Sequence, residues 1–240
     1  MLPVAILAGG LATRLGPLTE KIPKSLISID GEPFVAHQLR LLQRSAIQRV
    51  ILCVGHLGEQ IERVVGNGSS FGVQVTYSYD GATLQGTAGA IRTALPKLGE
   101  SFFVMYGDSY LACNYAAIEQ EFLRGGKWGL MTVFRNEGQW DASNVEFEGG
   151  RILAYNKKHL TPRMRYIDYG LGVFHADAFL RTRAIDLADV YAELLQADQL
   201  AAMEVRERFY EMGSPAGLEE MKSFLSRQGL NRQERGGPLD

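Results

Sequence analysis

The sequence contains few cysteines and few histidines, and its net charge is close to zero. Its two cysteines, Cys53 and Cys113, allow at most one disulfide, and Cys53 lies in an apolar run, so we expect reduced thiols in a cytoplasmic protein. The four histidines show no metal-ligand spacing. A net charge of −2 over 240 residues gives no general attraction to nucleic acid or to anionic membranes, so any anion site must be local.

Long apolar runs are also missing. No run approaches the length of a membrane-spanning helix, and the first residues lack the basic and then apolar pattern of a secretory signal. We therefore expect a cytoplasmic protein that binds neither nucleic acid nor membrane. With 46% hydrophobic and 22% charged residues, the composition is that of an ordinary globular domain.

Two common phosphate-binding motifs are absent as well. The Walker pattern fails because the stretch from Gly10 to Gly16 has the wrong spacing and Pro17 stands where lysine is needed. The dinucleotide fingerprint fails because Gly9 and Gly10 are adjacent. The sequence therefore predicts neither a P-loop nor a dinucleotide-binding turn.

What the sequence does have is a short apolar run, a turn of small residues and then fixed cations. Residues 4–7 read as a buried strand, which breaks at an Ala-Gly-Gly turn over residues 8–10. Arg14 and Lys24 follow, with prolines between them that keep the connection from continuing as a helix. Such an arrangement is typical of a polyphosphate site.

The same stretch resembles the signature of the sugar-1-phosphate nucleotidyltransferases, L-A-G-G-x-G-T-R-L-x-P-L-T-x-x-x-P-K. Residues 7–19 read LAGGLATRLGPLT, and Pro23 and Lys24 follow. The third glycine of the signature is Ala12 here, which restricts the loop if φ is positive. The resemblance implies an enzyme that condenses a nucleoside triphosphate with a sugar 1-phosphate, giving an NDP-sugar and pyrophosphate.

The pattern of elements predicts an α/β fold. Expected strands cover 49–54, 72–78 and 101–106, and expected helices cover 34–46, 57–65 and 86–95. The second half adds strands at 130–135, 144–147, 151–155 and 168–175 and helices at 187–196 and 215–227. We predict a Rossmann-like nucleotidyltransferase fold, with a mostly parallel central sheet flanked by helices and a smaller strand-rich second half. Residues 1–229 are expected to form one domain and 230–240 a flexible tail.

The expected chemistry needs positioned cations and a divalent metal, because the sugar phosphate is already an anionic nucleophile. By resemblance, Arg14 would neutralise the β- and γ-phosphates and Lys24 would support the α-phosphoryl group. Asp108, after an expected strand, and Glu211 would hold Mg²⁺. The family has aspartate where Glu211 stands, so the extra methylene moves the oxygens by roughly 1.5 Å. Without the resemblance, Asp108 reads equally well as a turn or helix cap.

The resemblance also assigns the two substrates. Lys157 would clamp the sugar phosphate, with Lys158 as its rival, while Asp168 would meet sugar hydroxyls beside Gly107. Small residues after position 85 equally fit close helix–sheet packing. The residues expected at the nucleotide are Leu7, Ala8, Gly9, Gly10, Asp80, Gly86 and Thr87.

The nucleobase is assigned from Asp80. A carboxylate can accept from both the N1–H and the N2 amino group of guanine, which favours GTP, with CTP second. The alternative is that Asp80 only forms a turn with Gly81. By resemblance, the heptose- and mannose-1-phosphate guanylyltransferases are the closest branch.

Two other functions remain open on the sequence. One is a phosphocholine-type cytidylyltransferase that uses CTP. The other is a non-catalytic subunit that senses nucleotide sugars and binds a partner protein, which we would expect to lack Arg14, Lys24 or Asp108. All three residues are present. The oligomeric state stays open, with a homodimer as the assembly to test.

Overall fold

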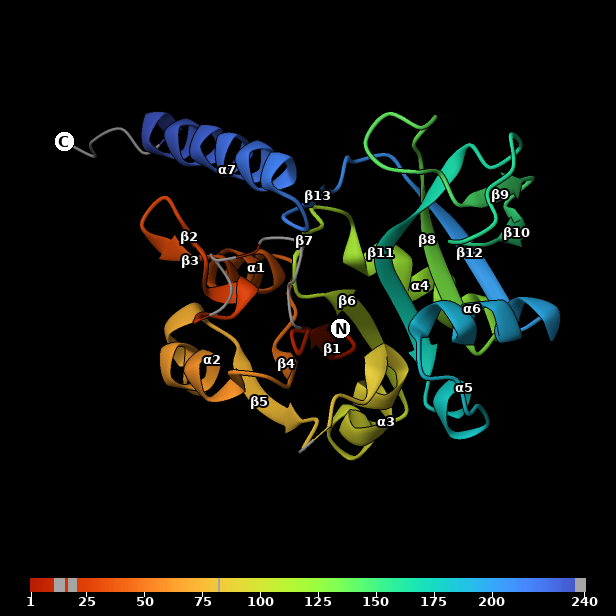
Figure 1. The fold of residues 1–240 in the computed structure, drawn as a ribbon, viewed down its shortest axis with the longest axis horizontal. Helices are drawn as coiled ribbons and strands as arrows, with labels where there is room; N and C mark the ends of the chain where they lie inside the picture. Colours follow the sequence, from red (N-terminus) through yellow and green to blue (C-terminus); the bar gives the residue numbers. More distant parts are fainter. Residues whose placement is uncertain (11–15, 17–20, 82, 236–240) are drawn as a thin grey trace.

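The first half of the chain builds a parallel sheet. The computed structural model describes residues 1–10, 16, 21–81 and 83–235 (Figure 1). Strand β1 (Val4–Leu7) lies between β4 (Arg49–Val54) and β6 (Ser101–Tyr106), and β5 (Gln74–Tyr79) continues beyond β4. All three pairings are parallel, so the carboxyl ends of these strands meet at one edge.

The second half extends the same sheet. Strand β11 (Tyr166–His175) pairs antiparallel with β6, β8 (Gly129–Arg135) pairs antiparallel with β11, and β12 (Leu200–Val205) runs parallel to β8. The hairpin of β9 (Val145–Glu148) and β10 (Arg151–Tyr155) forms an edge. The predicted fold class is confirmed: an α/β sheet with a parallel first half and a strand-rich second half.

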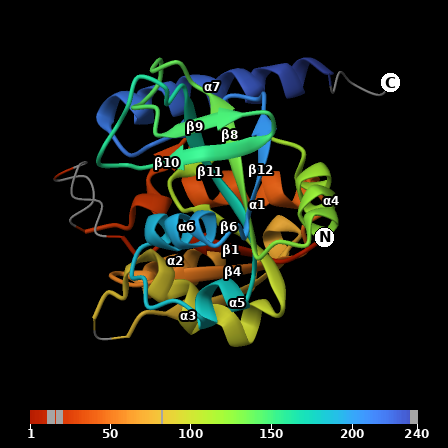
Figure 2. The same ribbon diagram turned by 90° about the vertical axis from the view of Figure 1, so that its right-hand side faces the viewer.

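Helices cover both faces of the sheet because its strands alternate apolar side chains to either side. In β4, Val50 and Leu52 join the core under α1 (Phe34–Arg44), α2 (Gly58–Val65) and α4 (Tyr115–Gly125). Ile51 and Cys53 join the opposite core, under α3 (Gly86–Leu98), α5 (Asp177–Leu180) and α6 (Leu187–Gln196). Figures 1 and 2 show α1 and α3 on opposite sides of β1 and β4.

The last helix, α7 (Pro215–Arg235), covers a third apolar cluster along one end of the molecule (Figure 1). Its Leu218 and Met221 pack in a cluster that includes Phe34 and Tyr110. The helix includes residues 230–235, which we expected in the tail. A glycine at position 229 weakens a helix by about 1 kcal/mol but does not stop it when good helix formers follow. Residues 236–240 lie outside the described part.

Several elements were not predicted from the sequence, among them α4, α5 and β12. They include the two-residue strands β7 (Ser109–Tyr110) and β13 (Tyr210–Glu211), which pair with each other, and β2 (Ser28–Ile29) with β3 (Glu32–Pro33). Short 3₁₀ turns occupy Lys24–Leu26 and Ser69–Phe71. Among the described residues, no helix is long and apolar enough to span a bilayer.

Candidate active site

A cavity of about 280 Å³ opens where the parallel strands end. In an open α/β sheet, ligands bind beyond the carboxyl ends of the strands, and β1 and β6 end here. The cavity gathers most of the residues predicted for the nucleotide and for catalysis. Its lining includes Leu7, Ala8, Gly9, Gly10, Lys24, Asp80, Gly86, Thr87, Gly107 and Asp108. Arg14 lies outside the described residues.

Two glycines of this cavity leave little room for a side chain. A Cβ on Gly107 would lie 2.7 Å from the carbonyl oxygen of Leu7, to which the Gly107 amide donates at 2.9 Å. A Cβ on Gly9 would come within 3.2 Å of the Asp80 carboxylate. The main chain of both turns therefore borders the cavity with no side chain between it and a ligand.

The cavity contains an ion pair between Lys24, a predicted catalytic residue, and Asp108, a predicted metal ligand. Lys24 Nζ lies 2.9 Å from Asp108 Oδ2, and the side chains are only 17% and 22% exposed. Lys24 begins the 3₁₀ turn after Pro23, while Asp108 follows β6 through Gly107. Because the pair is shielded from water, its charges are screened less than those of a surface pair.

The second predicted metal residue lies next to Asp108 along the backbone. Glu211 in β13 is paired with Ser109 in β7, and the Met212 amide donates to the Asp108 carbonyl oxygen at 3.0 Å. Glu211 itself is not among the residues that line the cavity.

The donor chemistry of these two carboxylates fits Mg²⁺. Within the described ranges, no group of three or more His, Cys, Asp or Glu side chains could enclose a metal. Mg²⁺ usually binds one or two carboxylates and completes its shell with water and substrate phosphates. Asp108 and Glu211 therefore suit a metal shared with a nucleotide rather than an all-protein cage.

Asp80 is buried at the wall of the cavity. Its residue is 8% exposed, and its carboxylate lies against the main chain of Gly9 and Gly55. Burial raises the pKa of Asp80, and a hydrogen bond from the Gln85 backbone partly opposes that shift. The placement suits an acceptor for a ligand group that enters the cavity.

The cavity offers no activated thiol. Cys53 lines it, but burial raises the pKa of the thiol to about 12, so it stays protonated at neutral pH. A covalent cysteine intermediate is therefore not part of the chemistry that this site supports.

Lys157 and Asp168 form a separate cluster beside the cavity. Lys157 Nζ lies 3.4 Å from Asp168 Oδ2 and 5.3 Å from the centre of the Tyr106 ring, and Tyr106 lines the cavity. Tyr155 donates to the same Asp168 oxygen at 3.3 Å, and the Asp168 amide donates to Asn144 at 3.0 Å. Burial opposes the charge of Lys157, but the Asp168 carboxylate and Tyr106 outweigh it and raise the pKa of Lys157. The ammonium group of Lys157 is therefore positioned by Asp168 without any ligand.

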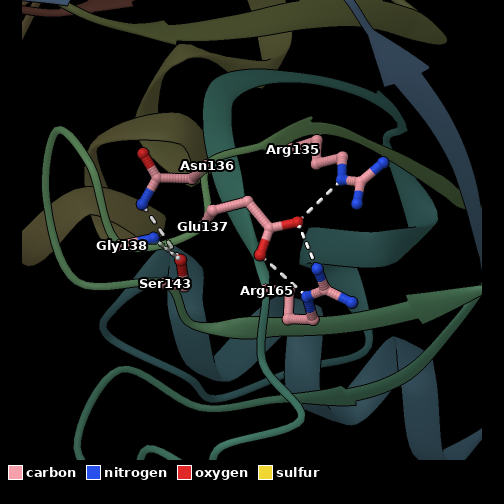
Figure 3. A network of polar contacts seen from close by, with 6 residues as sticks. All are labelled: Arg135, Asn136, Glu137, Gly138, Ser143 and Arg165. Atoms are coloured by element: carbon pink, nitrogen blue, oxygen red, sulfur yellow. Dashed lines mark hydrogen bonds and ion pairs between the residues drawn. The ribbon is translucent and has the colours of Figure 1, made fainter.

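The loop that ends at Asn144 is ordered by polar contacts (Figure 3). Glu137 accepts from Arg135 Nε at 2.8 Å and from Arg165 Nε at 2.7 Å. The buried Asn136 donates to Ser143 Oγ at 3.0 Å. Exposed ion pairs contribute little each, so we assign this network a local role in shaping the loop beside the Asp168 cluster.

Sequence reasoning missed Asp186, which lines the cavity from the loop before α6. Two contacts hold this loop to the start of α3: Ala88 N donates to Ile185 O at 2.8 Å, and Leu187 N donates to Thr87 Oγ1 at 2.7 Å. The Thr87 hydroxyl thus accepts a hydrogen bond within the protein. No local motif marks Asp186, because the contact joins segments about 100 residues apart.

Comparison with known proteins identifies the family and the fold of this chain. The profile of the family described as "Nucleotidyl transferase" matches residues 4–223. Mannose-1-phosphate guanyltransferase beta-B of Xenopus laevis is 28% identical over 231 residues, which cover 92% of this chain but only 62% of that protein. A putative glucose-1-phosphate thymidylyltransferase from Bacillus anthracis superimposes with a TM-score of 0.83 at 20% identity, covering 93% of this chain and 95% of the other. An inositol-1-phosphate CTP transferase from T. maritima gives 0.77 at 21% identity, covering 94% and 95%.

Proposed function

This chain belongs to the nucleotidyl transferase family, and on that premise we propose that it is a sugar-1-phosphate nucleotidyltransferase. The family resemblance expected from residues 7–24 is confirmed. The observation that carries the proposal is the Lys24–Asp108 pair, which lies in a cavity bordered by the bare main chain of Gly9 and Gly107. A sensor subunit would be expected to have lost one of these charged residues, but Lys24 and Asp108 are both present.

The proposed reaction needs no proton transfer. A phosphate oxygen of the sugar 1-phosphate attacks the α-phosphorus of the nucleotide. The bond that breaks joins this phosphorus to the oxygen that bridges the α- and β-phosphates. Pyrophosphate leaves with the electron pair of that bond. Lys24 stabilises the charge that develops at the α-phosphoryl group, and Arg14 neutralises the β- and γ-phosphates. Asp108 and Glu211 would hold Mg²⁺, which when bound neutralises phosphate charge.

The test is pyrophosphate release over a grid of nucleoside triphosphates and sugar 1-phosphates. Mg²⁺ is included, and the folded state of the protein is verified by circular dichroism. We expect release that requires both substrates, with GTP and a mannose or heptose 1-phosphate as the best pair. No release with any pair would contradict the proposal and favour the sensor reading.

CTP stays the second candidate, acting with a phosphocholine-type acceptor. The likeness to the inositol-1-phosphate CTP transferase supports only the fold, because the identity is 21%. CTP with phosphocholine and with inositol 1-phosphate therefore belongs in the grid.

Asp80→Ala is expected to weaken discrimination for GTP at least about tenfold. Removing the carboxylate takes away the acceptor that we propose for the two guanine donors, which is worth roughly 1–3 kcal/mol. Because the pKa of Asp80 is raised, the preference should also fall as acidic pH protonates the carboxyl group. The measurement is kcat/KM for five competing triphosphates. A parent that prefers UTP or dTTP, or a variant that keeps its GTP preference, would show the assignment to be wrong.

Lys157→Met is expected to raise the KM for the sugar phosphate at least about tenfold, with little change in the KM for the nucleotide. Lys157 and Lys158 are both exposed, and it is Lys157 whose Nζ lies over the ring of Tyr106, which lines the cavity. Losing one phosphate contact by a charged group costs on the order of 1.5–3 kcal/mol. Lys158→Met is the matched control and should change neither value. If Lys158→Met raised the KM for the sugar phosphate and Lys157→Met did not, Lys158 would be the residue that binds the sugar phosphate.

A further inference from the structure

A buried glutamine contacts the turn that carries Asp108. Gln38 on α1 is fully buried, and its Nε2 donates to the carbonyl oxygen of Ser109 at 2.8 Å and to that of Tyr106 at 3.3 Å. These two carbonyls lie on either side of Gly107 and Asp108. One side-chain amide therefore spans the turn from the last residue of β6 to the first residue of β7.

Two other contacts hold the same turn. The Gly107 amide donates to Leu7 O in β1, and the Asp108 carbonyl accepts from Met212, just after β13. Buried main-chain groups need hydrogen-bond partners, and here the partners come from three separate parts of the fold. Gln38 is the contribution of α1, so it couples this helix to the position of the Asp108 carboxylate.

The amide at position 38 is not explained by packing. Its helix neighbours Val35, Leu39 and Leu42 belong to the apolar core. The Gln38 Oε1 atom is buried and has no hydrogen-bond partner among the residues that the structure describes. An unpaired buried acceptor costs free energy, which an apolar side chain of the same shape would avoid. The two bonds made by Nε2 are therefore the reason for a glutamine here.

We propose that Gln38 is a positioning residue that fixes the Asp108 carboxylate for metal binding. By holding both ends of the turn, it keeps Asp108 Oδ2 at 2.9 Å from Lys24 Nζ and the turn aligned with Glu211. Without this donor, the turn must become ordered when the divalent cation binds. The free energy of ordering then lowers the affinity for the cation. This inference rests on the proposed function, because it assigns Gln38 to the metal end of the same site.

The test compares Gln38→Met with Gln43→Met, an exposed glutamine on the same helix. Methionine keeps the length and approximate volume of glutamine but donates no hydrogen bond. Two quantities are measured: the Mg²⁺ concentration that half-saturates pyrophosphate release, and Mn²⁺ binding by electron paramagnetic resonance with a non-reactive GTP analogue. Gln38→Met should raise the half-saturating Mg²⁺ concentration and weaken Mn²⁺ binding, each at least about tenfold. This is the usual effect of losing a group that orients a metal ligand. Metal-free nucleotide affinity should stay within about twofold, and Gln43→Met should match the parent.

Two further variants keep the test decisive if Gln38→Met does not fold. Histidine can place an N–H at the ε position, so Gln38→His should recover most of the Mn²⁺ affinity; Gln38→Asn is one methylene shorter and should not. Unchanged Mn²⁺ affinity in Gln38→Met, or in Gln38→Asn where the methionine variant is unfolded, overturns the proposal. An equal loss of metal-free nucleotide binding also overturns it, because that marks general damage. A parent that binds Mn²⁺ but releases no pyrophosphate would instead count against the proposed function alone.

Discussion

Lys24→Ala is expected to lower turnover at least about 100-fold while nucleotide affinity changes only a few-fold. Lys24 lies in the cavity, 17% exposed, where its charge faces little screening by water. We assign that charge to the α-phosphoryl group, where negative charge builds up only in the transition state. An interaction of this kind changes kcat rather than substrate binding, and losing one preorganised donor costs about 100- to 1000-fold.

The control is Lys21→Ala, which removes an exposed lysine three residues earlier. It should leave kcat within about twofold of the parent. Single-turnover kinetics and equilibrium binding of the nucleotide separate the chemical step from affinity. If Lys24→Ala kept turnover within a few-fold, a change of ~1 kcal/mol or less, Lys24 would not have the role assigned here.

Asp108→Asn is expected to abolish Mg²⁺-dependent turnover, with a loss on the order of 1000-fold or more. The substitution keeps the shape of the side chain and an oxygen that can still accept from Lys24. It removes the negative charge that a hard divalent cation requires. The variant should therefore fold normally and fail to bind the metal, which a titration with Mg²⁺ at fixed substrates would measure.

Asp198→Asn provides a matched control. Asp198 also forms an ion pair with a lysine, Lys127, at 2.7 Å, but neither residue lines the cavity. Its loss should leave the Mg²⁺ titration unchanged. Full activity of Asp108→Asn at low Mg²⁺ would remove Asp108 from the metal site. Glu211→Asp, in contrast, should be tolerated or improve activity, because aspartate is the residue that the family signature has there.

The sequence predicted the elements that local patterns determine. The apolar runs at Val4–Leu7, Arg49–Val54 and Ser101–Tyr106 became strands with those same bounds, because buried parallel strands need continuous β-branched and aromatic residues. Asp108 was placed correctly at the strand edge because the strand before it is unambiguous. These inferences needed only a few neighbouring residues.

Contacts between distant segments could not be predicted in this way. The pairing of β7 with β13, which brings Glu211 next to the Asp108 turn, joins two-residue strands that carry no periodicity of their own. Thr87 was expected at the nucleotide and lines the cavity; its hydroxyl also accepts from Leu187 and helps to hold the Asp186 loop, a contact that no local pattern shows. Gln38 is a polar residue in an amphipathic helix, and only the folded structure shows that it lies under the Asp108 turn.

The measurement that tests the central claim most directly follows the oxygen atoms of the acceptor. Mannose 1-phosphate with ¹⁸O in its non-bridging phosphate oxygens is incubated with GTP, Mg²⁺ and the protein, and the products are identified by mass spectrometry. If a phosphate oxygen of the sugar attacks the α-phosphorus, the NDP-sugar retains all of the label and pyrophosphate contains none. The two products should form in equal amounts, and neither should form with Lys24→Ala on the same time scale. Guanosine diphosphate with a doubly phosphorylated sugar, or pyrophosphate without an NDP-sugar, would contradict the account.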